Sequence, residues 1–100
     1  MQRYPDAPKY LDQNLVERWH QLAPIAARKG TLTVSSVDAF ARYVIAEQEY
    51  LRASQRVFNA LRTGNTSDAV AWSQIQDRFY RELQTSGRIF GLTPDADLLR

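Results

Sequence analysis

Few residues in this 100-residue chain could carry out chemistry. Cysteine is absent, which excludes disulfides, thiolate metal sites and a cysteine nucleophile. His20 is the single histidine, so no imidazole cluster exists for zinc or for a histidine-paired base. The closely spaced acids are Glu47 with Glu49 and Asp95 with Asp97, and neither pair suits a two-metal site. A glycine-rich phosphate-binding loop is missing as well. The sequence therefore predicts no catalysis, no metal and no cofactor.

The basic residues are distributed unevenly along the chain. Thirteen Lys and Arg residues against eleven Asp and Glu give a net charge of +2. Bases outnumber acids before Thr63, and acids slightly outnumber bases after it, so the N-terminal half is the basic one. Arg28 and Lys29 come directly before Gly30, where they could complement a helix dipole or contact phosphate. No run of 18 apolar residues exists, and residues 1–9 lack the apolar core of a signal peptide.

Residues 35–63 are predicted to form a long central helix, because no Gly or Pro interrupts residues 36–62. At 100° per residue, one apolar stripe contains Val37, Phe40, Val44, Leu51 and Phe58. A second stripe beside it contains Tyr43, Tyr50, Val57 and Leu61. The opposite face collects Asp38, Arg42, Glu49, Arg52 and Arg56, together with Ile45. The apolar arc covers about half of the circumference, so we expect two neighbouring helices to pack on it at once.

Two further helices are expected around the central one. Residues 12–30 form a first helix that is kinked or broken at Pro24, after an extended arm at 1–11. Residues 67–91 form a third helix, which the short turn at Gly64 makes antiparallel to the second. Residues 92–100 are a short helix or tail. The prediction is a single all-α domain, with a broken first helix packed on a long helical hairpin.

Large apolar residues at helical spacing define the predicted core. Both tryptophans lie on apolar faces, so core packing or a subunit contact is favoured over base stacking. The predicted core residues are Trp19, Leu22, Phe40, Val44, Leu51, Phe58, Trp72, Ile75, Phe79, Leu83 and Phe90.

An ordered set of short motifs resembles one known family. The set consists of Pro8-Lys9-Tyr10-Leu11, Trp19, Leu22-Ala23-Pro24, Gly30, Leu32, Asp38, Tyr43, Tyr50 and Phe90-Gly91-Leu92-Thr93-Pro94. In this order and spacing it is similar to the small terminase subunits of tailed double-stranded DNA bacteriophages. The chain departs from that pattern at Asp95-Ala96-Asp97, where the family often has Ser and Arg, and in its shorter turn after Gly64.

The resemblance implies a DNA-packaging factor that is not itself an enzyme. Small terminases assemble as homo-oligomeric rings, with a nonamer the best expectation here. They bind the packaging site on viral double-stranded DNA and recruit that DNA to the large terminase subunit, whose ATPase and nuclease they modulate. The resemblance also implies a location in the cytoplasm of the host bacterium and no membrane partner.

Within this resemblance, basic residues of the N-terminal half are expected to contact DNA. These are Arg3, Lys9, Arg18, Arg28 and Lys29. The expected oligomer contacts are Glu47, Ile45, Tyr50 and Arg62. Glu47 interrupts the apolar arc, so we expect either a partly exposed position or an ion pair with Arg62 or Arg42 of a neighbouring subunit. The segment after Gly91 is left for the large subunit.

Two other function classes fit the same elements. The first and second helices with the turn between them could form the helix-turn-helix of a small transcription regulator. Against this reading, the second helix is long for a recognition helix, and its exposed face mixes acids with bases. The other alternative is a helical adaptor with no role in nucleic-acid binding.

Overall fold

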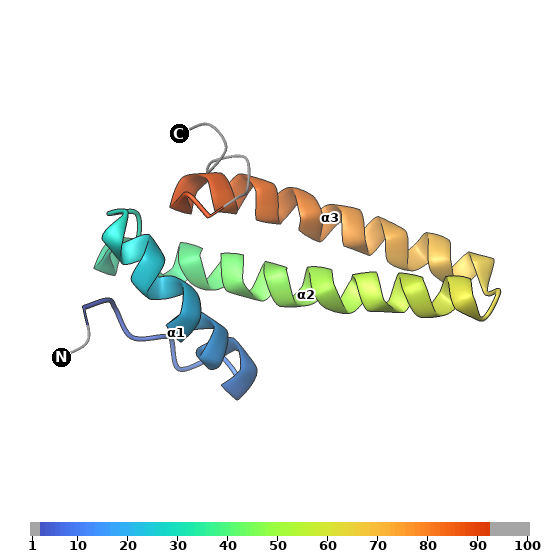
Figure 1. The fold of residues 1–100 in the computed structure, drawn as a ribbon, viewed down its shortest axis with the longest axis horizontal. Helices are drawn as coiled ribbons and strands as arrows, with labels where there is room; N and C mark the ends of the chain where they lie inside the picture. Colours follow the sequence, from blue (N-terminus) through green and yellow to red (C-terminus); the bar gives the residue numbers. More distant parts are fainter. Residues whose placement is uncertain (1–2, 93–100) are drawn as a thin grey trace.

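A computed structural model describes residues 3–92 of the chain. Its elements are α1 (Gln13–Arg28), a short 3₁₀ turn (Val34–Ser36), α2 (Val37–Arg62) and α3 (Thr66–Phe90), without strands in the described part. Figure 1 shows α2 and α3 as a long antiparallel hairpin, with α1 crossing the hairpin near the start of α2. The molecule is elongated, with extents of 50 × 33 × 18 Å. The all-α prediction is confirmed.

Local sequence signals account for the ends of the helices. The Asp12 side chain accepts a hydrogen bond from the Leu15 N–H (2.9 Å) and begins α1. The Asn65 side chain does the same for the Asp68 N–H (3.1 Å) and begins α3. Between α2 and α3, Gly64 has φ = 77°, a left-handed conformation that only glycine adopts at low cost. This tight turn brings α3 back along α2.

Pro24 does not break the first helix, so of the kink and the break that the sequence predicts the break is wrong. α1 runs continuously from Gln13 to Arg28 with Pro24 inside it. Proline removes a single backbone donor, and Ala23 and Ala26 in the same turn are fully buried in the core. We infer that packing of this turn compensates for the lost hydrogen bond.

The core lies where α1, the start of α2 and the end of α3 meet. Trp19, Phe40 and Phe90 are buried and meet edge to face, with ring centroids 5.0 Å and 4.9 Å apart. The Trp19 indole N–H donates to the Pro5 carbonyl (3.1 Å), which ties the N-terminal arm to this core. The other buried residues of the cluster are Leu11, Leu22, Ala23, Ala26, Leu32, Ala41, Tyr43 and Val44.

The rest of the hairpin is joined by small residues. Ala46, Ala53 and Ala60, spaced seven residues apart on α2, are buried, as is Ala69 on α3. Alanines in the seam allow two helices to approach closely, which leaves the larger apolar side chains beside the seam rather than in it. Trp72, Ile75, Phe79 and Leu83, which were predicted as core residues, are accordingly only half-buried.

Leu51 and Phe58 are not core residues of the single chain, contrary to the prediction. Their side chains are 60% and 64% exposed. Leu51 lines an open hollow beside α1, and no second helix of the described chain covers the apolar stripe at either residue.

The C-terminal end of the described chain is fixed by hydrogen bonds. Gly91 has φ = 69° and ends α3, and the Leu92 N–H donates back to the Gly87 carbonyl (2.9 Å). The short helix or tail predicted at 92–100 lies, apart from Leu92, outside the described residues. No helix within residues 3–92 is long and apolar enough to span a membrane.

Candidate functional site

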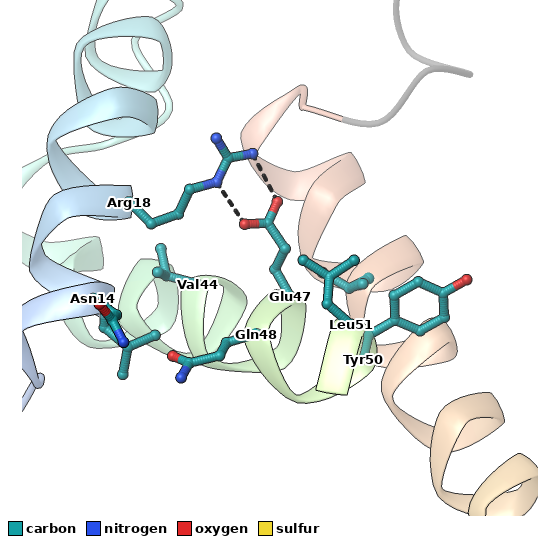
Figure 2. Close-up of a pocket in the computed structure, with 9 residues that line it drawn as sticks. Asn14, Arg18, Val44, Glu47, Gln48, Tyr50 and Leu51 are labelled. Atoms are coloured by element: carbon teal, nitrogen blue, oxygen red, sulfur yellow. Dashed lines mark hydrogen bonds and ion pairs between the residues drawn. The ribbon is translucent and has the colours of Figure 1, made fainter. Parts of the chain in front are cut away.

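Arg18 and Glu47 form a two-point ion pair between α1 and α2. Arg18 Nε donates to Glu47 Oε1 (2.6 Å) and Arg18 Nη2 donates to Glu47 Oε2 (2.9 Å), as drawn in Figure 2. The hydrogen bond to the Glu47 carboxylate raises the pKa of Arg18 above its ordinary value. Sequence reasoning placed Arg18 on DNA and paired Glu47 with Arg62 or Arg42 of a neighbouring subunit. In the structure, the two residues neutralise each other within one chain.

The ion pair borders a largely apolar hollow of about 630 Å³ between α1 and the hairpin. Val44, Tyr50 and Leu51 of α2 line it, with Leu15 of α1 and Leu83 of α3. Figure 2 shows Tyr50 and Leu51 on the turn of α2 that follows Glu47. The hollow therefore leads from the α1–α2 junction onto the uncovered part of the hairpin.

Five of the exposed large apolar side chains lie on the hairpin along one side of the α2–α3 seam. They are Leu51, Phe58, Leu61, Val70 and Tyr80, and together we call them the apolar flank. Contacts across the seam fix this side: Tyr50 packs against Tyr80 (centroids 5.7 Å apart), and Gln76 donates to the Ser54 hydroxyl (2.9 Å). The helical positions of Leu61 and Val70 place them on the same side. Exposed apolar side chains gathered on one side of a small protein make this flank a candidate interaction surface.

The opposite side of the seam has different chemistry. It contains Arg42, Ile45, Arg56, Trp72, Arg78 and Phe79, and we call this set the cationic flank. The Arg56 guanidinium lies over the Trp72 ring, 5.4 Å from its centroid, and Arg42 pairs with Glu82 of α3 (3.3 Å). A hollow of about 270 Å³ opens between Ile45 and Phe79. Arg42 of α2 and Arg78 of α3 therefore border an apolar depression on this flank.

A third surface lies at the end of the molecule opposite the Gly64 turn. Arg28 occupies the last turn of α1, and Arg88 the last turn of α3. Lys29 Nζ donates to the Gly91 carbonyl, which brings these two helix ends together. Arg3 borders a shallow hollow with Thr33 and Val34 at the same end. We call Arg3, Arg28, Lys29 and Arg88 the basic end.

Lys29 and Thr31 satisfy carbonyls at the end of α3. The Thr31 hydroxyl donates to the Phe90 carbonyl (3.0 Å), next to the Gly91 carbonyl bound by Lys29. Both helix C-termini carry partial negative charge, which the Lys29 ammonium offsets. Lys29 therefore takes one of the two roles that the sequence left open for it, that of a helix-dipole partner, and does so at the end of α3 as well as of α1.

The remaining predicted site residues are dispersed. Lys9, before the start of α1, and Arg62, at the end of α2, are exposed, while Ile45 and Tyr50 are half-buried on opposite sides of the seam. Arg88 is not among the predicted DNA contacts, because the prediction considers only the basic residues of the N-terminal half. The predicted antiparallel hairpin could have indicated Arg88, since such a hairpin brings the end of α3 next to the start of α2. Within residues 3–92, no group of three acidic or histidine residues could hold a metal ion.

Similarity to known proteins is found in one family model. No curated protein and no solved structure gives a significant match. A family model described as phage terminase, small subunit, matches residues 16–97, which is most of the chain. That range contains most of α1, the whole hairpin and both of its flanks. The chain belongs to the family of phage terminase small subunits.

Proposed function

We propose that this protein assembles into a homo-oligomeric ring that binds viral double-stranded DNA and delivers it to the large terminase subunit. It acts in the cytoplasm of the host bacterium, and a nonamer is the ring size that we propose. The chain is not itself an enzyme: the ATPase and nuclease belong to the large subunit, and this chain modulates both. Residues after Gly91 are the proposed contact with that subunit.

One observation carries the proposal: the protomer keeps its apolar and its basic surfaces apart. The apolar flank lies on the hairpin, and Leu51 and Phe58 on it are more than half exposed. The basic end lies at the other extreme of the same helices, where α1 and α3 terminate. Such a protomer can bury its hairpin against further copies while Arg3, Arg28 and Arg88 of every copy stay exposed to a polyanion.

Assembly also raises the affinity of the protein for DNA. Arg3, Arg28 and Lys9 give one protomer about two or three phosphate contacts, which are weak at physiological salt. A ring repeats these contacts, so that several protomers bind one duplex at a high effective concentration. Neither a metal nor a cofactor is needed for this function.

Light scattering combined with DNA titration tests the proposal. We expect a mass of many chains at micromolar concentration, and binding whose log affinity falls linearly with log salt. The double variant Arg3→Ala with Arg28→Ala should keep that mass and bind any DNA sequence more weakly. A monomer would contradict the assembly, and an assembled protein with no affinity for DNA would contradict the DNA role.

The same measurement separates the two alternative functions. A helix-turn-helix regulator would be a dimer with strong sequence preference. Against that reading, Arg42 and Arg56 of α2, which a recognition helix would point at DNA, bind Glu82 and Trp72 of the same chain. A helical adaptor would show no salt-dependent DNA binding.

A further inference from the structure

We infer that neighbouring copies join by unlike surfaces: the apolar flank of one hairpin packs against the cationic flank of the next. This inference rests on the proposed self-assembly and specifies which surfaces meet. The occupant of the apolar flank is thus a second copy of this chain. The larger apolar side chains of one copy fill the depression between Ile45 and Phe79 of the other.

The apolar flank has the shape and chemistry of the inserting partner. On α2 its exposed residues, Leu51, Phe58 and Leu61, are accompanied by the uncharged Ser54 and Gln55. Within the single chain the Glu47 carboxylate nearby is already neutralised by Arg18. Burying this strip therefore desolvates no unpaired charge of α2, which would otherwise oppose association.

The cationic flank has the shape and chemistry of the receiving partner. Its depression of about 270 Å³ has apolar walls from Ile45, Ala46 and Phe79. The cations at its rim already have partners, because Arg42 pairs with Glu82 and Arg78 lies over the Phe79 ring, 5.1 Å from its centroid. A Phe or Leu side chain of another copy that enters the depression therefore meets charges that are already paired. Asp77, which helical position places beside Tyr80, adds an acid opposite these arginines.

Like surfaces fit less well. Two cationic flanks would bring Arg42, Arg56 and Arg78 of both copies together, and like charges at an interface are strongly unfavourable. Two apolar flanks could associate, but such a self-complementary contact closes at two copies and leaves the depression empty. Pairing of unlike surfaces repeats from copy to copy, as a ring requires.

A mixing experiment distinguishes the two modes. Phe58→Glu blocks the apolar flank, and Ile45→Glu blocks the cationic flank. We expect each variant alone to be a monomer of 11.5 kDa. In an equimolar mixture, the intact apolar flank of the second variant meets the intact cationic flank of the first. The mixture should therefore contain a one-to-one dimer and nothing larger.

The controls protect the experiment against misfolding. Ile89→Glu places the same charge at an apolar residue of nearly equal exposure (63%) outside both flanks, and should assemble like the wild type. Since Ile45 is half-buried, Arg78→Glu serves as a second block of the cationic flank, and circular dichroism reports whether each variant is helical.

Three results would overturn the inference. If Ile45→Glu and Arg78→Glu, both folded, still dimerise alone, the contact joins two apolar flanks. If wild type assembles and none of the variants changes its mass, the interface lies elsewhere, although the proposed function stands. If wild type is a monomer, the proposed assembly fails too, and the apolar flank belongs to a different protein partner.

Discussion

The Arg18–Glu47 ion pair is the main polar link between α1 and the hairpin. Its side chains are 42% and 20% exposed, so water screens the pair only in part. The bidentate geometry adds directional strength to the charge attraction. Because α1 is the element whose end carries Arg28, this pair also contributes to holding the basic end in place.

Breaking this pair should destabilise the protomer even where no assembly occurs. We expect Glu47→Gln to lower the free energy of unfolding by about 1 kcal/mol, discounted for the partial exposure of Arg18. Urea unfolding of Glu47→Gln, Arg18→Met and the double variant would give their coupling energy. If the two effects simply add, Glu47 has no partner in Arg18 and the expected intersubunit pair with Arg62 or Arg42 should be revived.

The pKa of Tyr43 predicts how the stability of the protein depends on pH in alkaline solution. Burial raises the pKa of Tyr43 above its ordinary value of 10.0, and the Glu47 carboxylate adds to this effect while Arg18 opposes it. A raised pKa in the folded state means that the protonated phenol is favoured by folding. This contribution is complete below pH 10 and is lost as the pH rises through the folded pKa.

Stability should therefore fall above pH 10 and fall less steeply in Tyr43→Phe. Urea unfolding between pH 8.5 and 11 measures this dependence. Tyr10→Phe is the matched comparison, since the pKa of Tyr10 is also raised, by desolvation and by its hydrogen bond to Asp38, yet its side chain is 63% exposed. Identical pH profiles for wild type and Tyr43→Phe would show that other groups cause the loss.

At the scale of elements, the sequence predicted the helices better than their contacts. Lack of Gly and Pro in residues 36–62 and the caps at Asp12 and Asn65 specify the hairpin directly, because they act within a few residues. The contact surface between α2 and α3 differs from the prediction, because the prediction placed the large apolar residues of both helices in the core. The small side chain of alanine does not stand out in a hydrophobic pattern. Only the packed structure shows that Ala46, Ala53 and Ala60 are buried against α3.

The candidate site was predicted less well for the same reason. Whether a charged residue is free for a ligand depends on residues distant in sequence. Arg18 pairs with Glu47, which is 29 residues distant in the sequence. Lys29 binds the Gly91 carbonyl, which is 62 residues distant. The periodicity of a sequence does not reveal such pairings. The predicted DNA contacts of Arg18 and Lys29 therefore rest on charge alone.

The end of α3 should be a stability centre, in contrast to its exposed neighbour. Phe90 is 1% exposed and contacts Phe40, so Phe90→Ala should lower the free energy of unfolding by about 3–5 kcal/mol. Ile89→Ala, one residue earlier and 63% exposed, should change it by less than about 0.5 kcal/mol. Thermal and urea unfolding of both variants test this placement, and similar losses would mean that the core is elsewhere.

Lys29 and Arg28 are adjacent cations with different expected roles. Lys29→Met keeps the aliphatic stem but removes the donor to Gly91, so amide exchange at Gly91 and Leu92 should become faster. Arg28→Met should leave that exchange unchanged and reduce the salt dependence of DNA binding instead. Hydrogen exchange and DNA titration on both variants measure the two effects. The assignment fails if the two substitutions give the same pair of results.

At the scale of the whole molecule, elongation keeps the hairpin flanks away from the basic end. Figure 1 shows α1 at one end of the hairpin, and the opposite part of α2 and α3 free of it. The residues proposed to join copies and those proposed to contact DNA are thus different residues of one chain. A substitution on a flank can consequently alter DNA binding only through the number of copies that act together.

This separation leads to a prediction for Phe58→Glu, which should separate the chains without touching the basic end. Each released protomer retains its two or three phosphate contacts, but the gain from simultaneous binding is lost. The plot of log affinity against log salt should flatten by about 0.9 for every phosphate contact that the assembly contributed beyond one protomer. Ser67→Glu is the control, since it adds the same charge on an exposed residue in the first turn of α3, outside both flanks and far from the basic end. A monomeric Phe58→Glu that binds DNA with the affinity and salt slope of Ser67→Glu would mean that one protomer suffices for recognition.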